Sequence, residues 1–307
     1  MLDIAAWRAA GSMAGCAGHR IFHVDSFHVD SAPGDAERPA ILLIHGFPTS
    51  SWDWTGVWPD LSRDHRLVAP DLLGFGWSAK PRRHRYSIME QADICEDLVR
   101  HLGLRRFHVL AHDYGDTVAQ EMLARQNARP AAERQWLSVC FLNGGLFPET
   151  HRARPVQKLL AGPLGPLLSA VLGKRSFARS FGAVFGPETK PSAAEIDAFW
   201  SLISHDGGRI VFHKLIGYMA ERRAHRERWL GALREACCPV QLINGSADPV
   251  SGAHMVARYR ELVRVDDATT ELPRIGHYPQ VEAPAAVVAA YRAFLAGSAA
   301  DRRRPPP

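Results

Sequence analysis

Short runs of apolar residues recur along the chain, and most of them are bounded by residues that favour turns. Seven of these runs, at residues 20–24, 40–45, 66–70, 107–111, 137–143, 240–245 and 268–272, are predicted to be β-strands. Between several of them the apolar positions repeat with helical spacing, which predicts helices at residues 87–102, 116–126 and 283–296. Apolar strands that alternate with helices indicate an α/β fold whose mostly parallel sheet is covered on both faces.

This alternation stops near residue 143 and resumes near residue 240. The segment between them contains helix-like stretches and almost no strand pattern. We therefore expect a helical cap, residues 144–230, inserted into a single core formed by residues 1–143 and 231–298. The basic and proline-rich end, residues 299–307, is expected to be a disordered tail.

Composition limits the class of protein. The chain has 307 residues, of which 46% are hydrophobic and 22% charged, which fits one large globular domain with an insertion and excludes disordered and fibrous proteins. The five cysteines are odd in number and show no metal-ligand spacing, so we expect reduced thiols in a cytoplasmic protein. No secretory signal is recognised at the N-terminus, and Pro163 and Pro166 interrupt the longest apolar stretch, so no spanning helix is expected.

The positive charge is concentrated in the predicted cap. The formal net charge is +5, whereas residues 144–228 contain 13 basic and seven acidic side chains, a local charge of +6. Because no basic run is interleaved with aromatic residues, we do not expect nucleic-acid binding. The apolar stretch 159–172 is interpreted as lid packing, with a hydrophobic substrate or a loose membrane contact as the alternative. Stable membrane insertion is not expected.

The most informative stretch is FHVLAHDYGD, residues 107–116. A strand runs into the small Ala111, then His112, Asp113 and Tyr114, and then Gly115 before a helix. This spacing is typical of a nucleophile elbow, a sharp strand-to-helix turn that needs small flanking residues and exposes its central side chain. A simple helix-capping aspartate is the alternative interpretation of Asp113.

An aspartate at an elbow indicates displacement chemistry. A carboxylate attacks an amide or ester poorly, because the resulting anhydride is less stable than the substrate. At a saturated carbon with a leaving group, such as an epoxide or an alkyl halide, it gives an alkyl-enzyme ester. The start of the helix after Asp113 would keep the carboxylate ionised.

Three further segments supply candidate partners. The loop His45-Gly46-Phe47-Pro48 follows an apolar strand, and it would place the amide of Phe47 beside that of Tyr114 in an oxyanion hole. Asp248 follows the strand at 240–245 as the candidate orienting acid, and His277 follows the last strand as the candidate base. The alternatives are a strand-end turn at the first segment, an Asx turn at Asp248 and a histidine without a catalytic role at His277.

With these motifs the chain resembles the epoxide hydrolase and haloalkane dehalogenase branch of the α/β-hydrolases. The resemblance covers about residues 20–295, and the segments HGFPTSSWDW, DLLGFGWSAKP, AHDYGD, NGGLFPETHR, FGPETKPS and GHYPQ look most like the mesoderm-specific transcript subgroup. It implies an α/β-hydrolase fold with a mostly parallel eight-stranded sheet, an inserted helical lid, and catalytic roles at the positions of Asp113, Asp248 and His277.

The resemblance also suggests which leaving group is used. Dehalogenases of this branch hold the halide with a tryptophan after the nucleophile and a second donor from the lid or from an asparagine after His-Gly; here Tyr114 and Phe47 occupy the corresponding positions. Epoxide hydrolases protonate the opening ring with lid tyrosines, and Tyr218 is the single tyrosine between residues 144 and 228. A packing aromatic is the alternative role for Tyr218.

Epoxide hydrolysis to a diol is therefore the leading hypothesis. Hydrolytic dehalogenation is the second, and a non-catalytic, ligand-binding homologue is the third. The expected partners are a small hydrophobic substrate and water, without metal or organic cofactor, and the chain is expected to be a monomer or a small homo-oligomer. Asp116 adds a second carboxylate one turn after Asp113, and it either caps the helix or tunes Asp113 or a bound cation.

Overall fold

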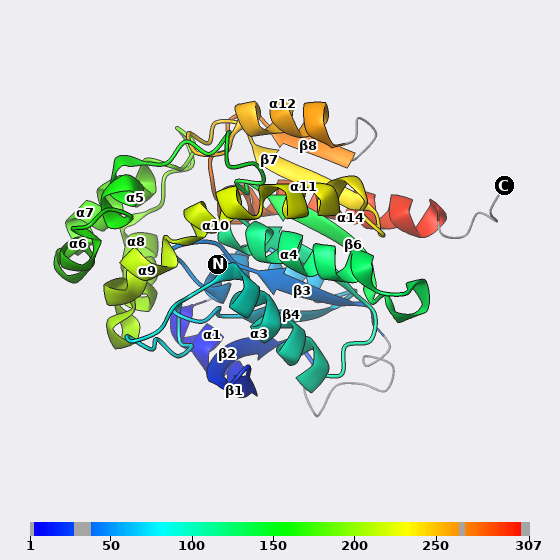
Figure 1. Cartoon of the computed structure of the whole chain (residues 1–307), viewed down its shortest axis with the longest axis horizontal. Helices are drawn as coiled ribbons and strands as arrows, with labels where there is room; N and C mark the ends of the chain where they lie inside the picture. Colours follow the sequence, from blue (N-terminus) through cyan, green and yellow to red (C-terminus); the bar gives the residue numbers. More distant parts are fainter. Residues whose placement is uncertain (1–2, 28–37, 264–267, 302–307) are drawn as a thin grey trace.

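The computed structural model describes residues 3–27, 38–263 and 268–301, which form one eight-stranded sheet surrounded by helices (Figure 1). The strands are β1 (Gly11–Cys16), β2 (His19–Asp25), β3 (Ala40–Ile44), β4 (Arg66–Pro70), β5 (Phe107–His112), β6 (Trp136–Leu142), β7 (Val240–Gly245) and β8 (Ala268–Leu272). Their order is β1-β2-β4-β3-β5-β6-β7-β8. The β1–β2 and β2–β4 pairs are antiparallel and all others are parallel, which confirms the predicted sheet.

The central strands are buried on both faces. Every residue of β3, β5 and β7 is buried, and β3 reads Ala-Ile-Leu-Leu-Ile without a polar position. Such a strand has no face that water can solvate, so it requires helices on both sides of the sheet. In Figure 1, α3 (Ile88–His101), α4 (Tyr114–Ala128) and α11 (Arg226–Arg234) lie in front of the sheet, and α14 (Pro284–Asp301) lies behind it.

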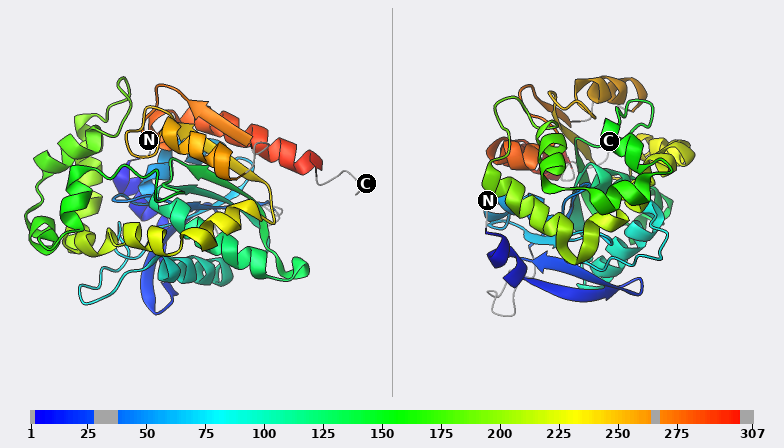
Figure 2. Two further views of the ribbon diagram at one scale, coloured as in Figure 1. Left: turned by 45° about the horizontal axis from the view of Figure 1, so that its top comes forward. Right: turned by 90° about the vertical axis from the view of Figure 1, so that its left-hand side faces the viewer.

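The segment between β6 and β7 is helical, as its sequence predicts. It contains α5 (Pro155–Leu160), α6 (Gly165–Val171), α7 (Lys174–Gly182), α8 (Ala193–Ser204), η4 (His205–Val211), α9 (Phe212–Leu215), α10 (Tyr218–Ala224) and α11. Figure 2 shows α5–α9 gathered over one end of the sheet. The remaining helical elements are α1 (Ile4–Ala9), η2 (Ser51–Gly56), α2 (Trp58–Leu61), η3 (Ala131–Glu133), α12 (Ala253–Leu262) and α13 (Pro279–Glu282).

Helix α11 does not lie with the cap helices. Its Trp229 donates a hydrogen bond from Nε1 to Glu121 of α4 at 2.9 Å, and Arg228 forms an ion pair with the same carboxylate at 2.7 Å. Because these contacts fix α11 on the core, we propose that the cap ends before Arg226 and not at residue 230.

Near both ends of the described chain the structure differs from what the sequence predicted. The edge strand β1 was not predicted from its apolar pattern, because Gly-Ser-Met-Ala-Gly-Cys has few residues that favour strands and its order comes from pairing with β2. Helix α14 continues to Asp301, so residues 299–301 of the predicted tail are helical. The other tail residues, 302–307, lie outside the described residues.

Candidate active site

Asp113 occupies the sharp turn between β5 and α4. Its backbone has φ 47° and ψ −102°, a conformation that side-chain-bearing residues rarely adopt and that costs roughly 1–3 kcal/mol. The turn is tight because a Cβ at Gly115 would lie 2.3 Å from the carbonyl oxygen of Ile44. The geometry is that of the predicted elbow, and it fixes the Asp113 carboxylate at the end of the sheet.

The loop after β3 approaches the same carboxylate. The amide of Phe47 donates a hydrogen bond to Oδ2 of Asp113 at 3.1 Å. Gly46 is required there, since a Cβ at this position would lie 2.6 Å from Nδ1 of His112 and 3.0 Å from Cβ of Asp113. His45 is held by the amide of Leu72, which donates to its Nε2 at 2.9 Å, and Pro48 follows as a cis residue at the cavity wall. Tyr114, whose amide is the second predicted donor, begins α4.

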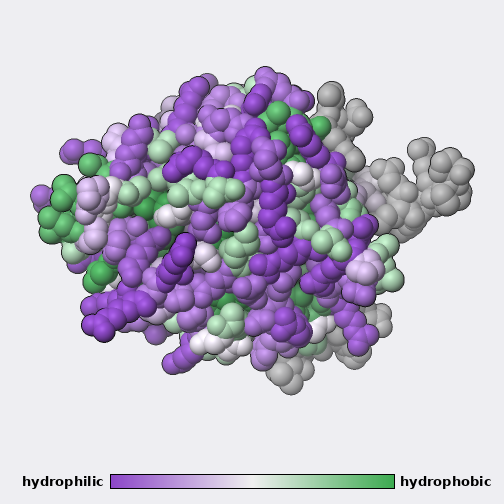
Figure 3. Space-filling view, viewed as in Figure 1, coloured by the Kyte–Doolittle hydropathy of each residue, from purple (hydrophilic) through white to green (hydrophobic). Residues whose placement is uncertain are grey.

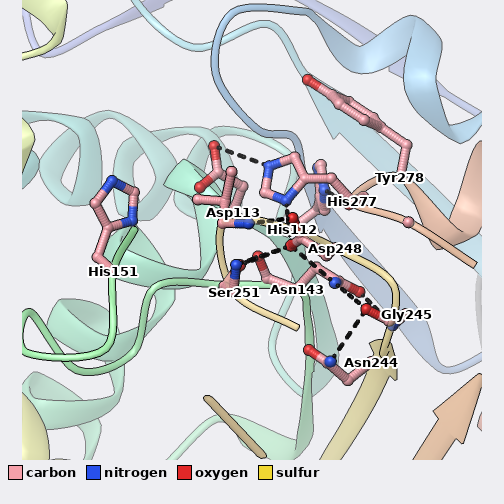
Figure 4. A network of polar contacts seen from close by, with 12 residues as sticks. His112, Asp113, Asn143, His151, Asn244, Gly245, Asp248, Ser251, His277 and Tyr278 are labelled. Carbon is pink, nitrogen blue, oxygen red and sulfur yellow. Dashed lines mark hydrogen bonds and ion pairs between the residues drawn. The ribbon is translucent and has the colours of Figure 1, made fainter. Parts of the chain in front are cut away.

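The loops after β7 and β8 bring the other two candidate residues together (Figure 4). Nδ1 of His277 donates to Oδ2 of Asp248 at 2.7 Å, and its Nε2 lies 3.9 Å from Oδ2 of Asp113. The Asp248 carboxylate also accepts from the amides of Val250 at 2.7 Å and Ser251 at 3.1 Å. All three predicted residues are thus adjacent, and each of the two imidazole nitrogens of His277 points toward one carboxylate.

These contacts set the charges of the site. Burial by itself lowers the pKa of His277, but the carboxylates of Asp248 and Asp113 outweigh it and raise this pKa to about 10. Burial raises the pKa of Asp113, but the positive charges of His277 and Arg222 bring it well below its usual range. In the free protein at neutral pH, Asp113 and His277 therefore form a buried ion pair.

Arg222 is a site residue that sequence reasoning missed. Its side chain is 2% exposed, and it donates from Nε to Oγ1 of Thr117 at 2.7 Å and from Nη2 to the carbonyl of Asp113 at 3.0 Å. Nη2 also lies 3.5 Å from Oδ1 of Asp113, and the guanidinium lies 4.5 Å from the ring centroid of Tyr218. In the sequence Arg222 is one of several cations in a polar helix, and nothing marks it as buried.

Asn143 and His151 are two further residues at the site that the sequence analysis did not identify. Asn143 donates from Nδ2 to Oδ2 of Asp248 at 3.1 Å and accepts from the amide of Gly245 at 2.7 Å. His151 lies across the Asp113 carboxylate from His277 (Figure 4), and burial together with the charge of Arg222 lowers its pKa to about 4. Its Nδ1 accepts from Arg222 at 3.5 Å, which leaves Nε2 as the protonated nitrogen, and this Nε2 has no hydrogen-bond partner among the described residues.

The two tyrosines named from the sequence are both buried. Tyr114 packs its ring against Phe75 and Tyr218. Tyr218 begins α10, and its hydroxyl accepts a hydrogen bond from Nε2 of Gln157 at 3.4 Å. Burial and the negative charge of Asp113 raise the pKa of Tyr218, which keeps its phenol protonated.

His112 and Asp116 lie close to Asp113 in the chain but do not line the cavity. Nε2 of His112 donates to the carbonyl oxygen of His277 at 2.7 Å, and burial lowers its pKa to about 3, so it remains neutral. Asp116 is fully buried, and neither carboxyl oxygen has a hydrogen-bond partner of good geometry among the described residues. The expectation that it caps the helix is therefore wrong. Burial and the charge of Asp113 raise the pKa of Asp116 far above its usual value, so its carboxyl is neutral.

A small cavity of about 80 Å³ opens onto Asp113 and His277. Its walls combine core residues with residues of α5 and α7, and most are apolar: Phe47, Pro48, Val156, Phe177, Phe181, Val184, Val250 and Tyr278. The polar lining residues supplied by the cap are Arg154, Gln157 and Ser180. A cavity of this size holds about three water molecules, so it fits a small apolar molecule.

One cluster outside the cavity has donors suited to a metal ion. His19, His84 and Glu90 offer ligand atoms within 4.8 Å of one another, and no other such group of three is found among the described residues. In this structure Glu90 accepts from both imidazoles, at 3.2 Å and 2.7 Å, and so ties β2 to α3. The five cysteines, which the sequence predicts to be reduced, are all free thiols.

Comparison with known proteins identifies the family. A model described as alpha/beta hydrolase fold matches residues 39–131. The mesoderm-specific transcript protein of Mus musculus is 41% identical over 295 residues, which cover 94% of this chain and 87% of that protein. A putative hydrolase, LipZ of Mycobacterium tuberculosis, is 40% identical over 291 residues, which cover 94% and 96% of the two chains. The chain belongs to the mesoderm-specific transcript family of α/β-hydrolases.

Beyond the mesoderm-specific transcript family the similarity is weaker. Epoxide hydrolase 3 of Xenopus tropicalis is 26% identical over 285 residues, and haloalkane dehalogenase 2 of Mycobacterium bovis is 27% identical over 266 residues; each alignment covers 86% of this chain. These matches cover 73% and 88% of the two relatives. The crystal structure of a loop variant of the haloalkane dehalogenase DbeA from Bradyrhizobium elkanii has a TM-score of 0.77 and 21% identity, covering 96% of this chain and 99% of that one. This likeness confirms the α/β-hydrolase fold.

In this member of the mesoderm-specific transcript family, no described helix is both long and apolar enough to cross a bilayer. The longest helix, α14, contains charged Arg292 in its middle and is part of the core.

Proposed function

We propose that this protein hydrolyses epoxides to diols through an ester formed on Asp113. The observation that carries the proposal is the position of the Asp113 carboxylate. It is an ionised group at a strained turn, it faces a small apolar cavity, and it lies 3.9 Å from a histidine that a second carboxylate orients.

In the first half of the cycle, one oxygen of Asp113 attacks a ring carbon and the C–O bond of the epoxide breaks. The alkoxide that forms takes a proton, and Tyr218 is the proposed donor because burial keeps its phenol protonated. The hydroxyl of Tyr218 accepts its hydrogen bond from Gln157, a cavity residue, so its own proton remains to be donated.

The ester bond also changes His277. Once Asp113 is alkylated it carries no charge, and one of the two carboxylates that raise the pKa of His277 is lost. His277 then gives up its proton, which restores Tyr218, and the neutral imidazole becomes a base. Alkylation thus converts the resting ion pair into a catalyst for the second half of the cycle.

In the second half, His277 takes a proton from water and the hydroxide attacks the carbonyl carbon of the ester. The charge that develops on the former carboxylate oxygen is stabilised by the amide of Phe47, which already donates to Oδ2 in the free protein, and by the amide of Tyr114. The ester opens to release the diol, and the Asp113–His277 ion pair is restored. The cycle needs only epoxide and water.

The test is mass spectrometry of the His277→Ala variant after incubation with a matched pair of small compounds, 1,2-epoxybutane and 1-bromobutane. Without the base the ester accumulates. Trypsin cleavage after Arg106 and Arg125 yields peptide 107–125, in which fragment ions separate Asp113 from Asp116 and Glu121. We expect the peptide to gain the whole mass of the epoxide at Asp113 and to remain unmodified with the bromide. The Asp113→Asn, His277→Ala double variant is the control and should carry no adduct.

Dehalogenation is the second candidate, because the unpartnered Nε2–H of His151 is a buried donor of the kind that stabilises a leaving halide. In that case the bromide, and not the epoxide, labels Asp113. The Tyr218→Phe variant sharpens the distinction: it should slow labelling by the epoxide and leave labelling by the bromide unchanged. No adduct across a wide panel of both classes would overturn both candidates and favour the third, a ligand-binding homologue.

A further inference from the structure

The cap exposes a cluster of apolar side chains at its outer end. Five large hydrophobic residues are exposed in the described part of the chain, and four of them belong to α5, α6 and the turn between them. They are Leu159 at 54%, Leu164 at 61%, Leu167 at 62% and Val171 at 66% exposure. We call these four residues the outer apolar cluster. Packing within the cap was the expectation for this stretch, and it is wrong for these four positions.

The exposure follows from a well-defined local structure. In α6 and at its two ends the exposed positions 164, 167 and 171 recur at helical spacing, whereas Leu168 and Leu172 turn inward and pack on the core. The inner side is fixed by polar contacts as well: Oγ of Ser169 accepts from the amide of His213 at 3.1 Å, and Arg209 donates to the carbonyl of Leu172 at 3.0 Å. The cluster is therefore one face of an anchored amphipathic helix.

Basic residues predominate in the chain segment that carries this cluster. Between Glu149 and Glu188 the chain has no acidic residue and six basic ones, at positions 152, 154, 158, 174, 175 and 179. Lys158, Arg175 and Arg179 are exposed, and Lys174 forms an ion pair with Asp197 of α8. Figure 3 shows hydrophobic side chains beside hydrophilic ones at the left-hand end, where α5 and α6 lie in Figure 1.

We propose that α5, α6 and α7 form a docking surface for a bilayer that contains anionic lipids. Exposed leucines on one face of a short helix, in a segment with six basic residues and no acidic one, match the chemistry of a monotopic membrane contact. A second copy of the chain fits this face less well, because self-association would bring cations of the two copies together. The surface does not depend on which reaction the site performs.

The surface lies beside the cavity. Val156 and Gln157 of α5 and Phe177 and Phe181 of α7 line the cavity, while Leu159 and Arg179 of the same helices face outward. A bilayer in contact with α5–α7 would therefore meet the cavity wall, and apolar molecules dissolved in the lipid would reach Asp113 through a short path.

The test is flotation of the full chain with vesicles of phosphatidylcholine alone or mixed with phosphatidylglycerol in a ratio of seven to three. We expect flotation with the anionic vesicles, a loss of about tenfold in partition for Leu164→Ser/Leu167→Ser, and a similar loss for Arg175→Glu/Arg179→Glu. Raising the salt concentration should weaken binding of the wild-type chain. Hydrogen exchange should show protection of residues 159–171 on vesicle addition.

Matched controls are available elsewhere on the surface. Met13→Ser removes an exposed apolar side chain on β1, and Arg105→Glu/Arg106→Glu reverses two exposed charges before β5; both should float like the wild type. Circular dichroism confirms that each variant is folded. The proposal is overturned if the wild-type chain does not float, if the α6 variant floats unchanged, or if light scattering shows a dimer that only Leu164→Ser/Leu167→Ser disrupts while vesicle binding is absent.

Discussion

The α/β core and the helices inserted between β6 and β7 differ in whether their charged and apolar side chains are buried or exposed. In the core, Asp113, Asp248 and His277 are buried and joined through 2.7 Å and 3.9 Å contacts, and apolar side chains fill both faces of the sheet. In the insertion, the outer apolar cluster faces solvent beside exposed basic residues.

This difference shows which side chains must be held in one position: the buried charged groups of the core must be, and the exposed leucines of the cap need not be. A buried ion pair is stable only if each charge is held by specific partners, so the core can tolerate few changes. Exposed leucines contribute little to folding, and this is why we propose a contact outside the chain for the outer apolar cluster. Arg222 joins the two regions, because it belongs to α10 and yet its guanidinium lies against Asp113.

The largest effect should come from the core aspartates. Asp113→Asn replaces the attacking carboxylate by a neutral, poorly nucleophilic amide, and adduct formation with the reactive compound of the matched pair should fall by at least about 10³-fold. Asp116→Asn, three residues later in the first turn of α4, should retain adduct formation because Asp116 does not line the cavity. Intact-protein mass spectrometry in the His277→Ala background measures both. Equal labelling of the two variants would place the nucleophile elsewhere.

The second-largest effect is on the free energy of unfolding, and it distinguishes a packed side chain of the core from an exposed one of the cap. Phe141 of β6 is completely buried, and Phe141→Ala should lower the free energy of unfolding by about 3–5 kcal/mol. Leu167→Ala on the outer face of the cap should change it by less than about 0.5 kcal/mol. Urea denaturation followed by circular dichroism measures the two. A large loss at Leu167 would mean that this residue packs within the chain in solution.

The third effect tests the link between the regions. In Arg222→Met the pKa of Asp113 should rise, because a buried cation beside it is lost. In the His277→Ala background, the rate of adduct formation at Asp113 should therefore fall by about tenfold in mildly acidic buffer and recover partly as the pH rises. Intact-protein mass spectrometry across this pH range measures the rate. Arg223→Met, the adjacent exposed arginine, is the control. A loss that is the same at every pH would indicate a purely structural role for Arg222.

The smallest effect on the reaction concerns Asp116, whose change should appear in stability. Its pKa is raised in the folded protein, so the unfolded chain loses this proton first and stability falls as the pH rises above the ordinary aspartate pKa of 3.8. Asp116→Asn does not titrate, and its stability relative to wild type should increase with pH by up to about 1.4 kcal/mol per pH unit between pH 4.5 and 7.5. Urea denaturation at the two pH values measures this gain. A difference that is independent of pH would show that Asp116 is not held in its neutral form.

Much of the core could be predicted because its sequence pattern is dictated by burial. The strands at β4, β7 and β8 were predicted with their observed ends, and the elbow around Asp113 followed from its small flanking residues. Asp248 and His277 could be proposed because their loops follow strands that end at the same edge of the sheet.

The missed features depend on contacts between distant segments. Arg222 reaches Asp113 across 109 residues of chain, and Asn143 reaches Asp248 across 105, so no local pattern reveals either contact. The apolar stretch of the cap was assigned to packing because apolar residues are usually buried. Only the structure shows which side of α6 faces outward.

The wide separation of the site residues along the chain has a consequence during synthesis. The elbow is complete when β5 and α4 have formed, but His277 is translated about 160 residues after Asp113, roughly 10–30 s later at typical elongation rates. Until β8 docks, the emerging polypeptide has a potential alkyl acceptor and no base to turn it over. If the proposed ester forms on the nascent chain, it would therefore persist until His277 has been translated and has docked beside Asp113.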